Sequence, residues 1–215
     1  MKSIFITLSV VGLTTFLSVN TQAGIPIPMS FTTSDSVHTF PDALRKDFWE
    51  KLGIKAEAKG TARPIDEPSI GGNSSKFNYP VTSILINHKM KIELGRANGT
   101  VMVYSRLGEN GKLNSLTLSN FSIDYKRHHV LADATYGDGK KQLKLPIFDF
   151  SIETPLNFHY RFPIGIISYE KLNRLYLTDQ AKSVYQEALD LPNTAIPLLS
   201  MDFGTLTQSG SSKIR

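Results

Sequence analysis

The chain has 215 residues, of which 40% are apolar; 24 are Lys or Arg, 19 are Asp or Glu, and none is Cys. This length suits one domain with a substantial core, and the moderate charge content excludes a largely disordered chain. The lack of Cys excludes a disulfide framework, a thiol nucleophile and a thiolate metal site.

The first 23 residues have the pattern of a secretory signal peptide. A basic start at Lys2 is followed by an uncharged, mostly apolar run over 4–19 and by small residues that end at Ala23. An uncleaved membrane anchor is the alternative, but the run is short for a bilayer and contains Ser and Thr. We therefore expect cleavage after Ala23, export to the periplasm or the extracellular space, and no transmembrane segment in the mature protein.

Residues 40–52 are predicted to form a helix. Pro41 suits the first helical position, and Gly53 can end the helix in a left-handed conformation. The apolar side chains Leu44, Phe48, Trp49 and Leu52 fall on one face. We expect the only Trp to pack this helix onto a sheet, and a place in a ligand cleft is the alternative.

From residue 77 to 150 the apolar side chains alternate with polar ones, as in half-buried strands. Turn-forming sequences at 95–99, 108–111 and 137–139 divide this stretch, and no helix lies between the strands. We therefore expect a mainly β fold: an antiparallel β-sandwich, Ig-like or barrel-like, with two short α-helices, in one domain over 24–207.

The rest of the chain adds further elements. An aromatic-rich extended run covers 158–176, and Pro163 within it indicates a bend or an edge position. Residues 178–189 are predicted to form the second helix. We expect a last strand over 196–206 and a flexible polar tail over 208–215.

Several short segments also resemble a known family in their order and spacing. They are Leu52-Gly53-Ile54, Gly99-Thr100-Val101, 116–124, 131–134, 145–150, 177–189 and Phe203-Gly204-Thr205-Leu206. Over about residues 30–207 this order resembles the exported bacterial β-sandwich family that includes the haem-transport-associated domain. In haem-binding members, the resemblance implies an iron-ligating Tyr on an early helix and a supporting His near the Gly-Thr-Val strand.

The chain departs from that ligand set at both places. Its predicted first helix contains no Tyr, and the residues 102–106 that follow Gly99-Thr100-Val101 contain no His. The resemblance therefore implies the fold more directly than it implies haem, which we treat as a candidate cofactor only.

Tyr125, His128 and His129 are the candidate cofactor-binding residues, because they lie together at the expected tip of a hairpin. Phenol and imidazole groups both ligate haem iron. Neighbouring strand residues face opposite sides, so both His reach one iron only if the tip is irregular. A solvated basic turn is the alternative. A second candidate for such contacts is 158–161, which contains a His, a Tyr and an Arg.

No catalytic or metal-binding motif is present. The five His form no His-x-x-x-His pair, and we find no Gly-x-Ser-x-Gly elbow, no Ser-x-x-Lys at a helix start and no calcium loop. The basic balance and the clusters at 126–129 and 140–144 indicate attraction to an anionic polymer, and export argues against a nucleic-acid partner.

We therefore expect a non-enzymatic binding or interaction module of the bacterial cell envelope or extracellular space. A haem- or porphyrin-binding protein of an iron-uptake system is the first alternative. An envelope hydrolase with catalytic loops is the second, since a sandwich can carry catalysis on its loops.

Overall fold

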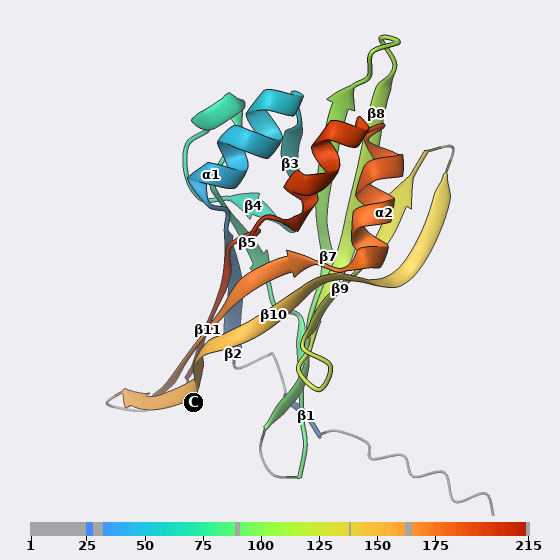
Figure 1. Cartoon of the computed structure of the whole chain (residues 1–215). Helices are drawn as coiled ribbons and strands as arrows, with labels where there is room; N and C mark the ends of the chain where they lie inside the picture. The colour runs from blue at the N-terminus through green and yellow to red at the C-terminus, as the bar shows by residue number, and fades with distance from the viewer. Residues whose placement is uncertain (1–24, 28–31, 89–90, 138, 162–164, 214–215) are drawn as a thin grey trace, which may run out of the picture.

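Figure 1 shows a computed structural model of the chain, which describes residues 25–27, 32–88, 91–137, 139–161 and 165–213. The predicted signal peptide, 1–23, lies outside these residues. Within them, no helix has the length and the apolar character needed to cross a membrane.

Twelve β-strands in the described residues form one sheet in which neighbouring strands pair antiparallel. In chain order they are β1 (Ile25–Ile27), β2 (Thr32–Thr39), β3 (Lys55–Gly60), β4 (Arg63–Pro64), β5 (Lys76–Pro80), β6 (Ser83–Ile86), β7 (Ile92–Leu107), β8 (Leu113–Asp124), β9 (His129–Tyr136), β10 (Lys140–Arg161), β11 (Gly165–Leu177) and β12 (Thr205–Lys213). The helical segments are α1 (Asp42–Leu44), the π-helix η2 (Arg45–Glu50), the 3₁₀ helices η3 (Ile70–Gly72) and η4 (Asn193–Ser200), and α2 (Asp179–Ala188).

The sheet runs in the order β1-β6-β7-β8-β9-β10-β11-β12-β2-β5-β4, with β3 paired to β7. It curves around the core like a nearly closed barrel (Figure 1). One continuous sheet therefore takes the place of the two separate layers of the expected sandwich. The prediction of a mainly β, antiparallel, barrel-like fold with two short α-helices is confirmed.

The first predicted helix forms as α1 and η2. Pro41 precedes it in an extended conformation, and Gly53 follows it with a φ of 67°. Trp49 is fully buried and contacts Phe40 and Tyr104, with ring centroids 4.6 and 6.2 Å apart. The indole therefore packs the helix onto the sheet, as predicted.

The second predicted helix forms as α2. The Thr178 hydroxyl caps it by accepting the Ala181 amide hydrogen at 3.1 Å. The buried face of α2 consists of Ala181, Val184, Tyr185 and Ala188.

The end of the chain differs from the prediction in two respects. Residues 193–200 form η4 instead of the first part of a strand, because the helix-compatible φ of Pro197 continues a tight turn. The expected flexible tail from residue 208 is ordered as far as Lys213, because β12 pairs on one side with β11 and on the other with β2. Its polar composition is misleading, since its inner side chains face a cleft and not an apolar core.

The predicted turn at 95–99 is also wrong, because β7 runs through it without reversing. Gly99 has a φ of 79° and lies in a β-bulge, and Asn120 on β8 and Lys144 on β10 occupy bulges with φ values of 54° and 52°. Asn120 accepts the Gly99 amide hydrogen at 3.1 Å and donates to Asp133 at 3.0 Å, and Asp133 accepts the Lys144 amide hydrogen at 3.0 Å. We call Gly99, Asn120, Asp133 and Lys144 the bulge row.

The bulge row separates two halves of the barrel. In the capped half the helices cover the inner face of the sheet, whereas the strands beyond the row extend away from the helices (Figure 1). The open half comprises that second part, chiefly 32–38, 83–88, 91–97, 121–131, 156–161, 165–170 and 205–213. The partner of β7 changes at the same place, from β6 in the open half to β3 in the capped half.

Candidate ligand-binding cleft

A cleft lies between two walls of the open half. Its apolar wall comes from β6, β7, β8 and β9, and its polar wall comes from β2, β11 and β12. The apolar wall consists of Ile84, Ile92, Ala97, Phe121, Ile123 and Val130. The polar wall consists of Ser34, Ser36, His38, Ser168, Glu170 and Gln208.

Strand pairing brings the polar wall together from distant parts of the sequence. Gln208 on β12 pairs with Glu170 on one side and with Ser36 on the other, so the three side chains share the inner face. The Gln208 amide donates to the Ser36 hydroxyl at 2.7 Å. In the next row Gly210 stands between Ser34 and Ser168, where a Cβ would come within 2.5 Å of the Ser168 hydroxyl.

Tyr125 and Glu170 connect the two walls. The Tyr125 hydroxyl donates to the Glu170 carboxylate at 2.6 Å, although the residues are 45 positions apart. Only 3% of Glu170 is exposed, and burial raises the pKa of its carboxyl while the hydrogen bond from Tyr125 opposes the rise. Burial and the neighbouring carboxylate raise the pKa of Tyr125 well above its usual value, so the phenol keeps its proton.

His38 is a second buried titratable group in the polar wall. Burial lowers the pKa of His38 from 6.5 to about 4, against the effect of its hydrogen bond to the Phe203 carbonyl. Because a carbonyl only accepts, Nε2 of the neutral ring carries the hydrogen and donates it at 2.9 Å. The ring lies against Phe40, with centroids 3.7 Å apart, and meets Phe148 edge to face, with centroids 5.6 Å apart. His38 is therefore a neutral, fixed part of the wall.

The cleft is narrow. Its free space is about 70 Å³, whereas pockets that enclose drug-sized ligands measure about 300 Å³ or more. On the apolar wall, a Cβ added at Gly95 would meet no atom within 4 Å, so this position opens onto free space. The cleft as it stands admits a slender group, and a broader molecule requires the walls to move apart.

The three sequence-predicted residues do not converge on one point. Tyr125 lines the cleft, as described above. His128 is exposed, has a φ of 57° and stacks on Phe150 with centroids 5.3 Å apart. His129 precedes the cleft-lining Val130 and faces the other side of the sheet, where its Nε2 lies 3.0 Å from the Asp149 carboxylate. The hairpin tip is irregular, which was the condition for both His to reach one iron. The irregularity nevertheless places the two imidazoles on separate contacts.

Sequence reasoning missed Glu170, Gln208 and His38 as members of the site. Glu170 interrupts an aromatic and aliphatic run, and a carboxylate at an inward strand position is the one sequence signal that could have marked it. Gln208 was assigned to the tail, so its place on the inner face required the pairing of β12.

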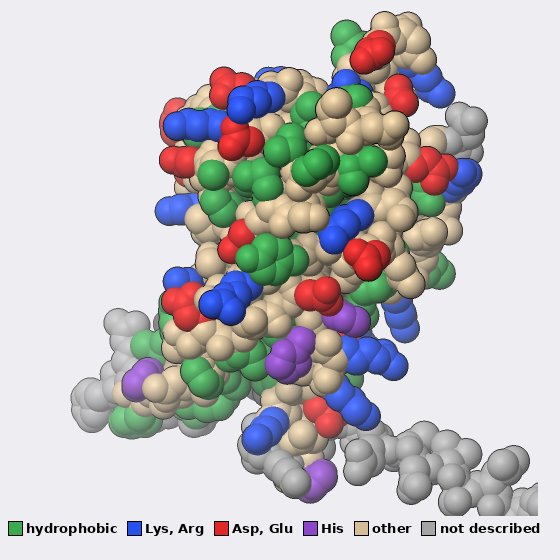
Figure 2. Space-filling model, viewed as in Figure 1, with side chains coloured by type: hydrophobic (Ala, Val, Ile, Leu, Met, Phe, Trp, Pro, Cys, Tyr) green, Lys and Arg blue, Asp and Glu red, His purple; other side chains and the backbone are tan. Residues whose placement is uncertain are grey.

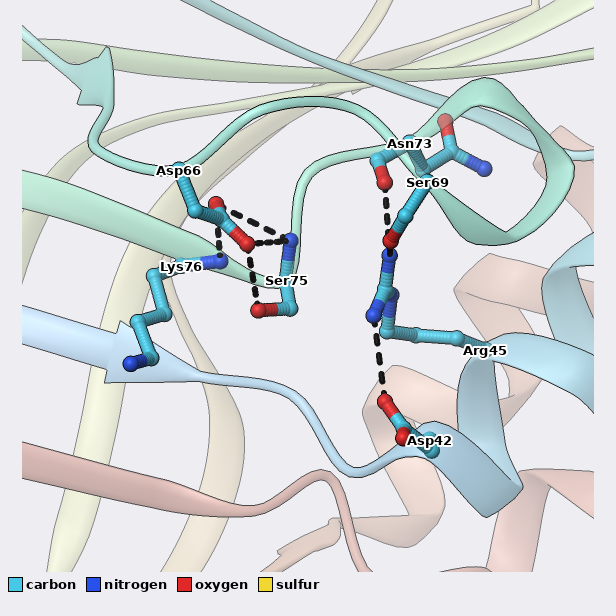
Figure 3. Close-up of polar contacts among 7 residues, drawn as sticks. All are labelled: Asp42, Arg45, Asp66, Ser69, Asn73, Ser75 and Lys76. Atoms are coloured by element: carbon cyan, nitrogen blue, oxygen red, sulfur yellow. Dashed lines mark hydrogen bonds and ion pairs between the residues drawn. The ribbon is translucent and has the colours of Figure 1, made fainter.

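A second polar cluster lies in the capped half and has a structural role (Figure 3). The Arg45 guanidinium is buried and donates to Asp42, to Ser69 at 2.6 Å and to the Asn73 carbonyl at 2.7 Å. Asp66 accepts hydrogen bonds from the next part of the same loop, which hold its pKa below the usual value against partial burial. These contacts fix the loop between β4 and β5 onto η2.

Two members of the basic clusters form ion pairs with acidic side chains, and the attraction to an anionic polymer stays a prediction. Lys140 pairs with Glu187 on α2, and Arg127 pairs with Asp124 at 3.3 Å. In the part of the chain that the structure describes, no group of three His, Cys, Asp or Glu side chains could hold a metal ion.

The fold and the cleft thus define an antiparallel, nearly closed β-barrel that is filled by helices at one end and cleft at the other. No protein-family model matches the chain, and no curated protein sequence matches it. Among solved structures, the C-terminal domain of HtaA from Corynebacterium glutamicum is similar, with 12% sequence identity and a TM-score of 0.47 over 84% of this chain and 97% of that chain. The family resemblance given under Sequence analysis therefore has no support from a sequence match.

Proposed function

We propose that this protein is an exported, non-enzymatic binding module whose cleft holds a small amphiphile. The apolar body of the ligand lies against the Ile84, Phe121 and Ile123 side chains. Its polar group reaches the Tyr125–Glu170 pair at the back of the cleft. Export rests on the signal-peptide pattern of residues 1–23.

The Tyr125–Glu170 pair is the observation that carries this proposal. Glu170 is a buried residue, and a carboxylate removed from water costs free energy unless hydrogen bonds compensate it; Tyr125 supplies one bond to a group that can accept several. A ligand hydroxyl, amine or amide that donates to Glu170 would satisfy the remaining capacity. Convergent polar groups beside an apolar surface are the usual composition of a small-molecule site.

The polar groups of the cleft favour binding over catalysis. His38 is neutral, packed against two aromatic rings, and donates through Nε2 to a backbone carbonyl, and Tyr125 is held protonated. A hydrolase would need a nucleophile activated by a base within hydrogen-bond reach. Ser36, the hydroxyl nearest to these groups in the strand register, instead accepts a hydrogen bond from Gln208.

Haem is a second candidate ligand, but the cleft and the predicted ligands Tyr125, His128 and His129 do not fit it in this arrangement. The free space of about 70 Å³ is too small for a porphyrin, and the Tyr125 oxygen is committed to Glu170. His128 and His129 lie on separate contacts outside the cleft. A haemin titration tests this directly: a Soret shift that is lost in Tyr125→Phe but kept in His128→Ala and His129→Ala would place haem in the cleft and reverse our ranking of the ligands.

A plug in the cleft tests the proposed function. Gly95→Phe would project a ring from the apolar wall into free space without a clash, since a Cβ there has no neighbour within 4 Å. Binding would be followed by the fluorescence of cis-parinaryl alcohol, a slender amphiphile whose hydroxyl can donate to Glu170, added to the purified mature protein. We expect saturable binding to the wild type and a loss of about tenfold or more in the plugged variant.

The matched control is Leu94→Phe, which adds a ring to the same strand on the opposite face of the sheet. It should bind the probe as the wild type does. Equal binding by wild type, Gly95→Phe and Leu94→Phe, or no saturable binding at all, would refute the cleft as the site.

A further inference from the structure

The described end of the β10–β11 hairpin carries large apolar side chains that are partly or mostly exposed. Phe158 is 57% exposed and Tyr160 70% exposed on β10, and Ile166 is 41% and Tyr169 39% exposed on β11. We call these four residues the hairpin patch. The hairpin extends away from the body of the protein (Figure 1), and hydrophobic side chains gather at this end in the space-filling view (Figure 2).

The hairpin patch occupies both faces of the hairpin. Phe158 pairs with Ser168, which lines the cleft, and Tyr160 pairs with Ile166, so these side chains lie on the inner face. Tyr169 precedes the cleft-lining Glu170 and therefore lies on the outer face. A protein partner normally covers one face of a hairpin, whereas an apolar medium surrounds both.

The charges around the hairpin patch favour an anionic surface. Residues 154–169 contain no Asp or Glu, and the chain as a whole has a formal net charge of +5. The sequence of these strands adds basic residues, since Arg161 is the last residue of β10 and Lys213 is the last residue of β12. Tyr side chains suit the boundary between water and hydrocarbon, because the ring is apolar and the hydroxyl remains hydrated.

From these observations we infer that the β10–β11 hairpin inserts its end into the surface of a lipid bilayer that contains anionic phospholipids. Phe158 and Ile166 enter the acyl region, and Tyr160 and Tyr169 lie at the level of the headgroups. The inner face of the hairpin continues into the cleft through Ser168, so insertion places the cleft beside the bilayer surface. This inference goes beyond the proposed function and does not depend on what the cleft binds.

Vesicle flotation tests the inference with the purified mature protein. The vesicles would contain phosphatidylethanolamine and phosphatidylglycerol, and a second set would contain only zwitterionic phosphatidylcholine. We expect the wild type to float with the anionic vesicles and less with the zwitterionic ones. Phe158→Asp should bind about tenfold more weakly, because a charge replaces the ring that we expect the bilayer to bury. The side chain is exposed, so the fold should survive, which a thermal melt verifies.

The matched control is Leu143→Asp. Leu143 lies near the other end of the same strand and is 75% exposed, so its substitution changes charge and apolar area equally without touching the hairpin patch. It should float like the wild type. A wild type that does not float, or a Leu143→Asp variant that loses binding as Phe158→Asp does, would overturn the inference.

A second measurement reports the position of the residue itself. In Phe158→Trp, the new indole should shift to shorter emission wavelength with anionic vesicles and be quenched by brominated acyl chains, whereas the buried Trp49 supplies a constant background. No quenching would refute insertion. The plug variant Gly95→Phe should still bind vesicles, so failure of the cleft and failure of the hairpin remain distinguishable.

Discussion

The capped half and the open half of the barrel share the long strands β7 to β11 but are filled differently. On β7, Met102 and Tyr104 in the capped half are fully buried beneath the helices, whereas Gly95 in the open half faces free space. Both sets of side chains follow the same inward alternation. The difference therefore comes from what lies on the inner face: helices that supply Trp49 and Tyr185 at one end, and the cleft at the other.

This difference explains why polar residues occupy inward positions in the open half. A carboxylate and an imidazole in the capped half would have to displace close-packed rings, whereas Glu170 and His38 each find a partner at the boundary of the cleft. Stability is thus concentrated at the capped end, which holds the walls of the open end in place while they remain able to bind.

The largest test of this comparison removes packing from one half at a time. Trp49→Ala should lower the free energy of unfolding by about 3–5 kcal/mol, because it leaves a cavity beneath the helices. Phe121→Ala, in the partly exposed wall of the cleft, should cost clearly less. Urea denaturation followed by circular dichroism measures both. Equal losses would contradict the assignment of stability to the capped half.

The boundary between the halves should respond to pH through His38. The folded pKa of about 4 lies below the unfolded value of 6.5, so the unfolded chain binds the proton first, and stability falls as the pH drops from 6.5 towards 4. The loss amounts to on the order of 3 kcal/mol. His38→Gln keeps a donor for the Phe203 carbonyl but does not titrate. The difference in unfolding free energy between the wild type and His38→Gln should therefore change with pH over this range. A constant difference would exclude His38 as the source of the pH dependence.

Across the cleft, Tyr125→Phe should lower the free energy of unfolding by about 1–3 kcal/mol, because it leaves the Glu170 carboxylate without its donor. The loss should shrink in the Glu170→Gln background, which carries no charge.

The raised pKa of Glu170 predicts a pH dependence of stability: ionisation of the carboxyl in the folded protein costs free energy, and this cost appears as the pH rises through the folded pKa. Glu170→Gln should abolish that component in denaturation curves recorded from acid to neutral pH.

The sequence predicted the elements of this fold better than their irregularities. Alternation located the strands from 77 to 150, and the caps Pro41 and Thr178 located the helices. Asn98-Gly99 was misassigned because an Asn-Gly pair satisfies the positive φ of a bulge as well as that of a turn. Only the partner strands decide between the two.

The candidate site was less accessible to sequence reasoning. Tyr125 was identified from its residue type and its neighbours, but its partner Glu170 lies on a strand that joins the wall through β10 and is far away in sequence. Nothing local to residue 170 indicates that contact. The polar composition of 208–213 predicted a tail because the rule that strands alternate with apolar residues fails where the inner face borders a cleft.

The smallest expected effect concerns the bulge row that divides the halves. Asp133→Ala removes the acceptor of the Lys144 amide hydrogen and of the Asn120 side chain, both near the surface, so the unfolding free energy should fall by about 1 kcal/mol. Glu57→Ala, which alters a carboxylate exposed on β3, should change it by less than about 0.5 kcal/mol. Because the bulges set the bend between the walls, Asp133→Ala should also weaken binding of cis-parinaryl alcohol, whereas Glu57→Ala should not. A variant that loses stability but binds the probe unchanged would show that the bend is fixed by the backbone pairing alone.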